Sequence, residues 1–259
     1  MRIENKFSQL KQQARAGLVT YIMAYDNDRD TSQYLLNNLP KNGADFIELG
    51  MPFSDPVADG VIIQDAAIRA LKAGAKLKNI LQMVSDFRMK DDVTPIILMG
   101  YYNPLQKYGL EKFTFDAKKA GVDAFLIVDL PPEEDEELFI ITKKNKINLI
   151  KLVTPTTDDD RLQLIAKKAS GFIYYVSVAG VTGTKSASYD SVDVAIKKIK
   201  KHITIPVAVG FGIKTKEDVK AISRYSDAVI VGSSLIKKLQ EDGKESVLSF
   251  VKNLSNGLK

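Results

Sequence analysis

Two carboxylates in one short stretch are the first residues of this sequence that could do chemistry. Glu48 lies inside the apolar segment FIEL, residues 46–49, and Asp59 follows in a loop that also holds Asp55 and two prolines. Desolvating an unpaired carboxylate is costly, so a buried strand rarely carries a glutamate without a reason. A carboxylate at the C-terminal end of a strand, followed by a stiff acidic loop, is typical of the active-site mouth of a β/α protein. Glu48 and Asp59 are therefore a candidate acid–base pair.

The two carboxylates should differ in protonation. If Ile47 and Leu49 pack outward against helices, Glu48 faces the mouth, and partial desolvation raises its pKa toward neutrality. Asp59, in the loop, should stay more solvated and ionised, and could pair with a developing positive charge. Two simpler explanations stay open. Glu48 could belong to a structural salt bridge, and Asp55 and Asp59 could be turn or cap residues, a role that aspartate favours.

Glycine-rich turns follow three apolar segments near the C-terminus and could bind an anion. Glycine lets backbone N–H groups approach an anion, and a helix N-terminus adds favourable partial charge. Glycines also simply close turns, so one such turn alone is a weak signal. The turns are Gly180 to Gly183, Gly210 to Gly212, and Gly232 with Ser233 and Ser234.

Other polar side chains at predicted strand ends could reach the same mouth. Tyr101 and Asn103 follow one strand and Asp129 follows the next, while Tyr174 lies within a later strand. A core tyrosine with a satisfied hydroxyl is an equally good explanation for Tyr174.

Eight strand–helix alternations must position these groups. The predicted strands are short and continuously apolar, as expected for parallel strands covered on both faces. Eight such units in 259 residues predict an α/β fold, a (β/α)8 TIM barrel forming a single domain over residues 1–259, with an extra N-terminal helix and an insertion after strand two. The predicted strands are 18–24, 46–49, 95–99, 124–128, 149–153, 172–176, 206–209 and 228–231. The predicted helices are 2–14, 31–42, 66–74, 77–89, 110–120, 133–144, 158–168, 192–201, 216–224 and 235–254, the last interrupted near Gly243.

The main rival fold is an open, doubly wound sheet. Such a sheet usually carries a GxGxxG turn after its first strand. Here that turn reads Tyr25-Asp26-Asn27-Asp28 and contains no glycine. The barrel is therefore the better prediction.

Composition excludes several function classes. The chain has no cysteine and one histidine, so thiolate chemistry, a histidine triad and a multi-histidine metal site are not expected, and no metal is implied. The net charge of +5 comes mostly from lysines in helical segments, without the exposed aromatics or motifs of nucleic-acid binding. The N-terminus is polar rather than a signal peptide, and no apolar run approaches the roughly 20 residues of a membrane span. We expect a cytoplasmic protein.

Four motifs then carry a resemblance that runs through essentially the whole chain: ELGMPFSDPVADGVIIQDAAIRAL, AGVTGT, VGFGIKT and VGSSLIK. In their order and spacing they resemble the α subunit of tryptophan synthase. The resemblance implies a lyase that cleaves indole-3-glycerol phosphate to indole and glyceraldehyde 3-phosphate by a retro-aldol reaction. Glu48 matches the catalytic glutamate, which protonates indole C3 and assists deprotonation of the glycerol hydroxyl. Asp59 matches the aspartate that accepts the indole N–H and stabilises the cationic intermediate.

The resemblance also implies a pocket, a lid and a partner. Tyr174 matches a pocket tyrosine, and Thr182 matches a threonine of a mobile loop that closes over substrate and contacts Asp59. The partner would be a β subunit in an αββα assembly, and that subunit, not this chain, would hold the pyridoxal phosphate cofactor. The positions matching the surroundings of the substrate phosphate are Gly183, Gly212, Gly232 and Ser233.

Two positions depart from the family pattern. The family usually shows Gly-Asp-Pro where this chain has Tyr25-Asp26-Asn27, and an arginine where this chain has Val178. Two alternative functions stay open. The chain could be a stand-alone indole-releasing lyase or another phosphate-binding barrel enzyme, or it could be mainly a regulatory binding subunit.

Overall fold

Parallel strands form the centre of the computed structural model, which describes residues 1–177, 189–210 and 212–258. Their order across the sheet is β5-β4-β3-β2-β1-β9-β8-β7-β6, and every pair of neighbours is parallel. The strands are β1 (Gly17–Met23), β2 (Phe46–Gly50), β3 (Ile96–Gly100), β4 (Ala124–Ile127), β5 (Asn148–Leu149), β6 (Lys151–Val153), β7 (Ile173–Val176), β8 (Val207–Gly210) and β9 (Ala228–Val231).

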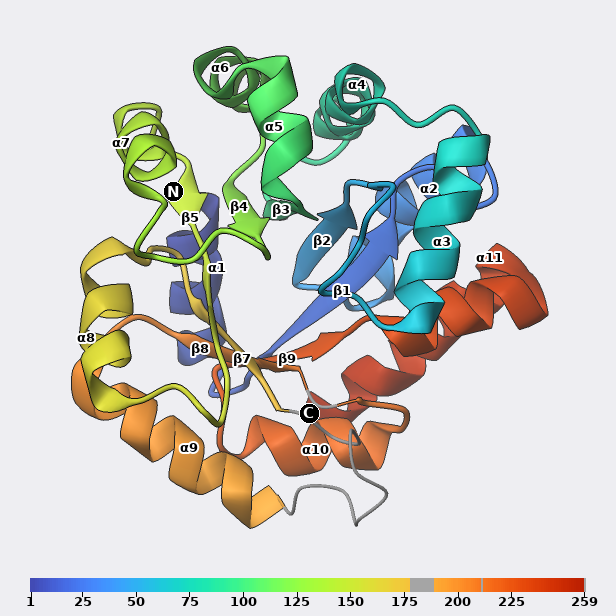
Figure 1. Ribbon diagram of the computed structural model, residues 1–259. Helices are drawn as coiled ribbons and strands as arrows, with labels where there is room; N and C mark the ends of the chain where they lie inside the picture. Colours follow the sequence, from blue (N-terminus) through green and yellow to red (C-terminus); the bar gives the residue numbers. More distant parts are fainter. Residues whose placement is uncertain (178–188, 211, 259) are drawn as a thin grey trace.

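The two ends of this sheet belong to one stretch of chain, which closes the barrel. Only Ile150 separates β5, which pairs with β4, from β6, which pairs with β7. The backbone N–H of Ile150 donates to the carbonyl of Phe125 at 2.9 Å, so the interruption is local. The stretch 149–153, predicted as one strand, is therefore a strand in two pieces, and the predicted (β/α)8 barrel is confirmed (Figure 1).

Helices surround the barrel (Figure 1). Within the described residues, no helix combines the length and apolar character needed to cross a membrane. The helices are α1 (Arg2–Gln12), α2 (Arg29–Asn38), η1 (Pro40–Asn42), α3 (Val61–Lys72), α4 (Leu77–Arg88), α5 (Tyr102–Tyr108), α6 (Leu110–Ala120), α7 (Glu136–Lys144), α8 (Asp159–Lys168), α9 (Tyr189–His202), α10 (Lys216–Ser223), α11 (Ser233–Ser255) and η2 (Asn256–Leu258).

Some helix boundaries differ from the prediction. The helix predicted over 66–74 begins at Val61, because the apolar run after Gly60 forms its first turn, and a short apolar run does not distinguish strand from helix. Helix α5 was not predicted, although Pro104 falls within its first turn, where proline is tolerated. Two helices, α5 and α6, thus lie between β3 and β4, just as two helices lie between β2 and β3. The predicted interruption of the last helix is confirmed, since Gly243 has a non-helical φ of 79° within α11.

Alternate residues of each strand point into the barrel and form its interior. Val19, Phe46, Ile97 and Phe172 belong to one buried cluster, which also includes Ile3 and Leu10 of α1. The ring of Phe7, also on α1, lies 4.7 Å from that of Phe46 and 6.0 Å from that of Phe172. The extra N-terminal helix thus covers the N-terminal end of the barrel.

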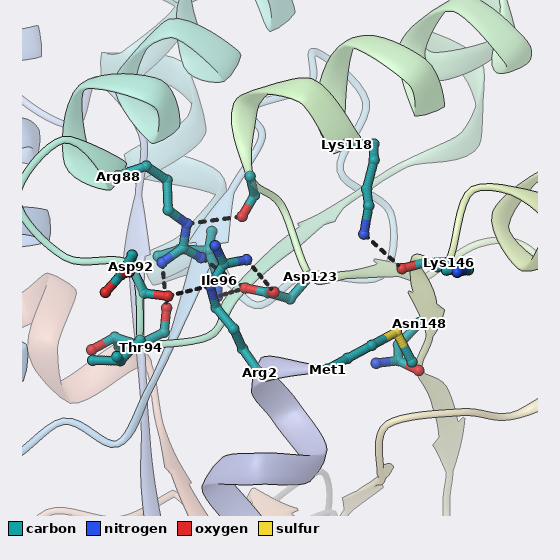
Figure 2. A network of polar contacts seen from close by, with 12 residues as sticks. Met1, Arg2, Arg88, Asp92, Thr94, Ile96, Lys118, Asp123, Lys146 and Asn148 are labelled. Carbon is teal, nitrogen blue, oxygen red and sulfur yellow. Dashed lines mark hydrogen bonds and ion pairs between the residues drawn. The ribbon is translucent and has the colours of Figure 1, made fainter.

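A buried polar network fixes α1 to this end (Figure 2). Asp123, just before β4, accepts hydrogen bonds from Nη1 of Arg2 at 3.0 Å, Nη2 of Arg88 at 2.7 Å and the backbone N–H of Ile96 at 2.9 Å. Arg88 also donates to the carbonyl of Gly121 at 2.9 Å. Burial lowers the pKa of Arg88 to about 10, which still leaves the guanidinium charged at neutral pH.

The same kind of contact recurs around this end of the barrel. A side-chain oxygen just before one strand accepts a backbone N–H from the start of the preceding strand. Besides Asp123 with Ile96, the pairs are Asp45 with Leu18, Ser170 with Leu149 and Asp227 with Val207, at 2.9, 2.8 and 2.8 Å.

Candidate active site

A cavity of about 290 Å³ lies over the C-terminal ends of the strands. Its floor is made by the last inward-facing residues of the strands, and its rim by the loops that follow them. Its lining combines apolar side chains with the polar residues Tyr21, Glu48, Asp59, Tyr174, Ser177 and Ser233. The apolar lining residues are Ala58, Ile63, Met99, Val128, Leu152, Val176, Ile213 and Ile230.

Glu48 of β2 provides the buried acid of this cavity. Ile47 and Leu49 pack outward into the core beneath the helices, so the intervening Glu48 side chain faces the cavity. Only 1% of Glu48 is exposed, and neither carboxyl oxygen has a hydrogen-bond partner. Burial, with a smaller contribution from the charge of Asp59, raises the pKa of Glu48 to about 8. Glu48 is therefore protonated at neutral pH and able to donate a proton.

Asp59 lies across the cavity from Glu48, in the loop before α3. Its Oδ2 accepts a hydrogen bond from the hydroxyl of Tyr101 at 2.9 Å, and that hydroxyl accepts one from the backbone N–H of Ala58 at 3.1 Å. Asp59 is only half-buried, more exposed than Glu48. Burial raises the pKa of Asp59, and the hydrogen bond from Tyr101 opposes that rise.

Two tyrosines also line the cavity. Tyr174 of β7 and Tyr21 of β1 both line it, and burial, together with the charges of Glu48 and Asp59, raises the pKa of both phenols well above the ordinary value. Both therefore stay neutral. Tyr21 was not among the predicted site residues. The signal was present, because Tyr21 lies two residues after the inward-facing Val19 and so shares its face of the strand.

Another part of the cavity rim is built from glycine turns and a helix N-terminus, after β8 and β9, which lie between the strands of Tyr21 and Tyr174. Gly212, with a φ of 65°, Gly232 and Ser233 all line the cavity. Helix α11 begins at Ser233 and has no side-chain cap at its N-terminus. The hydroxyl of Ser234 donates to the carbonyl of Ile213 at 2.6 Å, joining the two turns. Free backbone N–H groups at a helix start favour an anion.

Of the remaining predicted residues, one lies outside the cavity lining and three are not described by the structure. Asp129 is exposed and is not part of the cavity lining; its Oδ1 accepts the backbone N–H of Tyr102 at 2.8 Å, at the start of α5. Thr182, Gly183 and Val178 lie outside the described residues. Among the residues that the structure does describe, no three His, Cys, Asp or Glu side chains are grouped as metal ligands.

Chemistry rather than size identifies this cavity as the site. A larger hollow of about 1240 Å³ lies beside α1 and the C-terminal η2, and another of about 340 Å³ lies between α8 and α9. Neither is lined by a buried side chain that lacks a hydrogen-bond partner, whereas Glu48 is such a group and lies in the smallest of the three.

Comparisons with known proteins agree over the whole chain. A family model described as tryptophan synthase alpha chain matches residues 7–258. The crystal structure of tryptophan synthase subunit alpha from Legionella pneumophila str. Paris is 35% identical, with a TM-score of 0.93, covering 99% of this chain and 97% of that one. A chain from Aquifex aeolicus VF5 is 38% identical, with a TM-score of 0.92 and coverage of 100% and 99%. A chain of tryptophan synthase from M. tuberculosis, in the open form with BRD0059 bound, is 28% identical, with a TM-score of 0.91 and coverage of 99% and 98%. A barrel with a buried acid facing an aspartate, matched in this way from end to end, belongs to the tryptophan synthase alpha chain family.

Proposed function

We propose that this member of the family, whose role is that of a lyase in tryptophan synthesis, cleaves indole-3-glycerol phosphate to indole and glyceraldehyde 3-phosphate. The observation that carries the proposal is Glu48, an unpartnered and buried carboxyl group that faces Asp59 across an apolar cavity. The indole ring would lie between the apolar side chains, and the phosphate would lie at the glycine turns.

The proton transfers follow from the two carboxyl groups. Indole is a poor leaving group until its C3 carries a proton, and Glu48, protonated at neutral pH, would supply that proton. The ring nitrogen then becomes positively charged, and ionised Asp59 would accept its N–H and stabilise the charge. Glu48, now a carboxylate, would accept the proton of the glycerol hydroxyl next to the ring. The electrons of that O–H bond form the aldehyde carbonyl, and those of the breaking C–C bond return to the ring.

The phosphate end would hold the substrate without doing chemistry. Gly212, Gly232 and Ser233 would present backbone N–H groups to the phosphate oxygens at the start of α11. Gly183 is proposed as a further contact from its match to the family motif. Tyr174 is proposed as a pocket side chain, and Thr182 as part of a loop over the substrate.

We also propose a β-subunit partner in an αββα assembly, with pyridoxal phosphate in the partner, and a cytoplasmic location. Support for the partner comes from exposed apolar side chains in the loop that carries Asp59 and along the helix that follows it. Five of the twelve large hydrophobic residues exposed in the described part of the chain fall between residues 57 and 71. They are Val57, Val61, Ile62, Ile68 and Leu71. An exposed apolar patch of this kind is typical of a protein–protein interface.

The test of the reaction is Glu48→Gln, which keeps the shape of the side chain and removes its acid. We expect indole release from indole-3-glycerol phosphate to fall by about 10²–10⁴-fold or more, with the fold intact by circular dichroism. Asp55→Asn is the matched control, since Asp55 is an exposed carboxylate of the same loop that does not line the cavity. Its rate should stay within about twofold. Substantial residual turnover in Glu48→Gln would contradict the assignment.

Two alternatives are separated by the same assay. A stand-alone lyase would release indole as fast alone as with a cognate β subunit, whereas a synthase subunit should be accelerated by it. A mainly regulatory subunit would bind substrate in calorimetry and bind the partner, yet release little indole in either condition.

A further inference from the structure

A fully buried aspartate, Asp26, lies just beyond the site in the turn after β1. Its carboxylate receives two hydrogen bonds from Arg69, from Nε at 2.6 Å and from Nη2 at 3.0 Å. Gln240 adds a bond from Nε2 to the side-chain oxygen of Asn27 at 2.8 Å and a longer one to Asp26 at 3.4 Å. This cluster of Asp26, Arg69, Gln240 and Asn27 is not part of the cavity lining.

The cluster joins two helices, α3 and α11, that each contribute to the cavity lining. Arg69 lies on α3, and Gln240 lies on α11, whose first residue, Ser233, lines the cavity beside the glycine turns. Both helices pack on β1 and on each other, as Figure 1 shows for α3, in cyan, and α11, in orange-red. Asp26 therefore accepts hydrogen bonds from both helices.

A hydrogen bond joins the backbone of Asp59 to the start of α3. Nε2 of Gln64, in the first turns of α3, donates to the backbone carbonyl of Asp59 at 2.8 Å. The backbone N–H groups of Ile63 and Gln64 donate to the carbonyl of Gly60 at 2.9 and 3.0 Å. A shift of α3 along β1 would consequently carry the Asp59 carboxylate away from its place opposite Glu48.

The backbone around Asp26 is held in an unusual conformation. Tyr25 and Asn27, on either side of it, both have a φ of 68°, in the left-handed region that non-glycine residues rarely adopt. Residues in this region persist only where the surrounding structure holds them. The backbone N–H of Tyr25 donates to Oγ of Ser32 at 2.9 Å, and the Tyr25 ring is buried in the core. These two residues stand where the family pattern has glycine and proline.

We infer that Asp26 is a positioning residue for the lyase reaction. Through Arg69 it holds α3 so that Asp59 faces the ring nitrogen. Through Gln240 it fixes the position of α3 relative to α11, whose first residues lie at the phosphate end. The inference rests on the proposed function. Asp26 touches neither substrate nor Glu48, so its effect must pass through Asp59.

The test uses a pair of ligands that differ only in the group Asp59 would contact. An indole-3-propyl phosphate has the ring N–H, whereas the benzothiophene-3-propyl phosphate of similar shape has none. A hydrogen bond to a charged acceptor should make the wild-type protein prefer the indole ligand by about tenfold or more in calorimetry. In Asp26→Asn that preference should fall below about threefold. Affinity for the benzothiophene ligand should change little, because α11 keeps its bond to Asn27 and its packing on β1, and so holds the phosphate end in place.

Asp45→Asn is the matched control. Asp45 also forms a two-bond pair with an arginine, Arg15, at 2.8 Å for both bonds, but at the N-terminal end of the barrel. Asp45→Asn should lose stability in urea and keep the ligand preference. Arg69→Lys, which keeps the charge and removes the second bond, gives a second variant if Asp26→Asn does not fold. It should also lose the preference.

A preference that survives in both Asp26→Asn and Arg69→Lys, or that disappears equally in Asp45→Asn, would overturn the inference. A wild-type protein without any preference would instead refute the proposed contact between Asp59 and the ring nitrogen. Hydrogen exchange tests the positioning role of Asp26 independently of ligand binding. Amides of residues 59–66 should exchange about tenfold faster or more in Asp26→Asn than in wild type or Asp45→Asn, and unchanged exchange would refute the role of Asp26.

Discussion

The carboxyl group of Glu48 is useful because it is buried where nothing bonds to it. A partner such as arginine would keep it ionised, and exposure to water would keep its pKa near the ordinary 4.5, whereas burial raises its pKa to about 8. Because burial favours the protonated form of Glu48, the free energy of unfolding should fall as pH rises.

The first prediction concerns this linkage between pH and stability. Between pH 4.5 and 8 the folded chain keeps the Glu48 proton that the unfolded chain has lost. Stability should therefore fall as pH rises through that window, by at most about 1.4 kcal/mol per pH unit from this group, and level off above it. Urea midpoints at pH 6 to 9 should fall more steeply for wild type than for Glu48→Gln, which has no proton to lose. Parallel curves for the two proteins would contradict the assignment.

The second prediction concerns Tyr101→Phe. The Tyr101 hydroxyl donates to Asp59 and lowers its pKa, so the variant should raise that pKa further. In the proposed reaction Asp59 would have to be ionised to stabilise the cationic ring, so the acid limb of the pH–rate profile should move to higher pH. The alkaline limb, set by Glu48 near pH 8, should stay in place. We expect the rate at neutral pH to fall by about tenfold. A profile in which both limbs move together would contradict this role.

For individual residues, the sequence predicted some members of the candidate site and missed others, and each outcome has a physical reason. Glu48 and Asp59 could be found because carboxylates are out of place in an apolar strand and in a stiff loop beside it. Tyr21 was missed because an inward-facing tyrosine looks like a core residue. Asp129 was included because it follows a strand, yet its carboxylate accepts the backbone N–H at the start of α5, a distinction that depends on side-chain direction.

Among the elements, the strands were the most predictable. Continuous apolar runs fix where buried parallel strands begin and end, and the closed sheet leaves them little freedom. Helix starts were less certain, because α3 begins in an apolar run and α5 contains a proline. The break of one strand at Ile150 could not have been predicted from its apolar character.

The third prediction belongs to the junctions between elements. Asp123 joins α1, α4 and the start of β3, and the removal of one partner from a buried ionic network leaves charged groups unpaired. Asp123→Ala should lower the free energy of unfolding by about 3–5 kcal/mol in urea. Asp129→Ala is the control, since Asp129 is exposed and accepts one backbone N–H, and it should cost about 1 kcal/mol. Equal costs for the two would contradict the importance of the network.

Considered as a whole, the molecule has the candidate site at the C-terminal ends of the strands and a ring of structural polar contacts at the N-terminal ends, while the Asp26 cluster supports the site from its own end. Asp123, Asp45 and Asp227 lie before strands, while Glu48 and the glycine turns lie at or after strand ends. The single domain expected over residues 1–259 stays a prediction.

The fourth prediction concerns the proposed partner. Val57→Asp places a charge on the exposed apolar side chain of the acidic loop, which is 83% exposed and should tolerate the change in the isolated chain. Affinity for a cognate β subunit, measured by calorimetry, should fall by about tenfold or more. Val194→Asp, at a residue 68% exposed on α9, should leave affinity unchanged. Unaltered affinity in Val57→Asp would remove this patch from the proposed interface.

The aromatic side chains of Phe7, Phe46 and Phe172 bear on where a small molecule can enter or leave the barrel. These rings pack across the N-terminal end of the barrel, on the far side from the cavity that holds Glu48. In the proposed reaction, indole formed in that cavity would therefore leave by the C-terminal rim, where the substrate enters. A partner that received indole directly would have to bind at this rim, beside the loop that carries Asp59 and the exposed Val57.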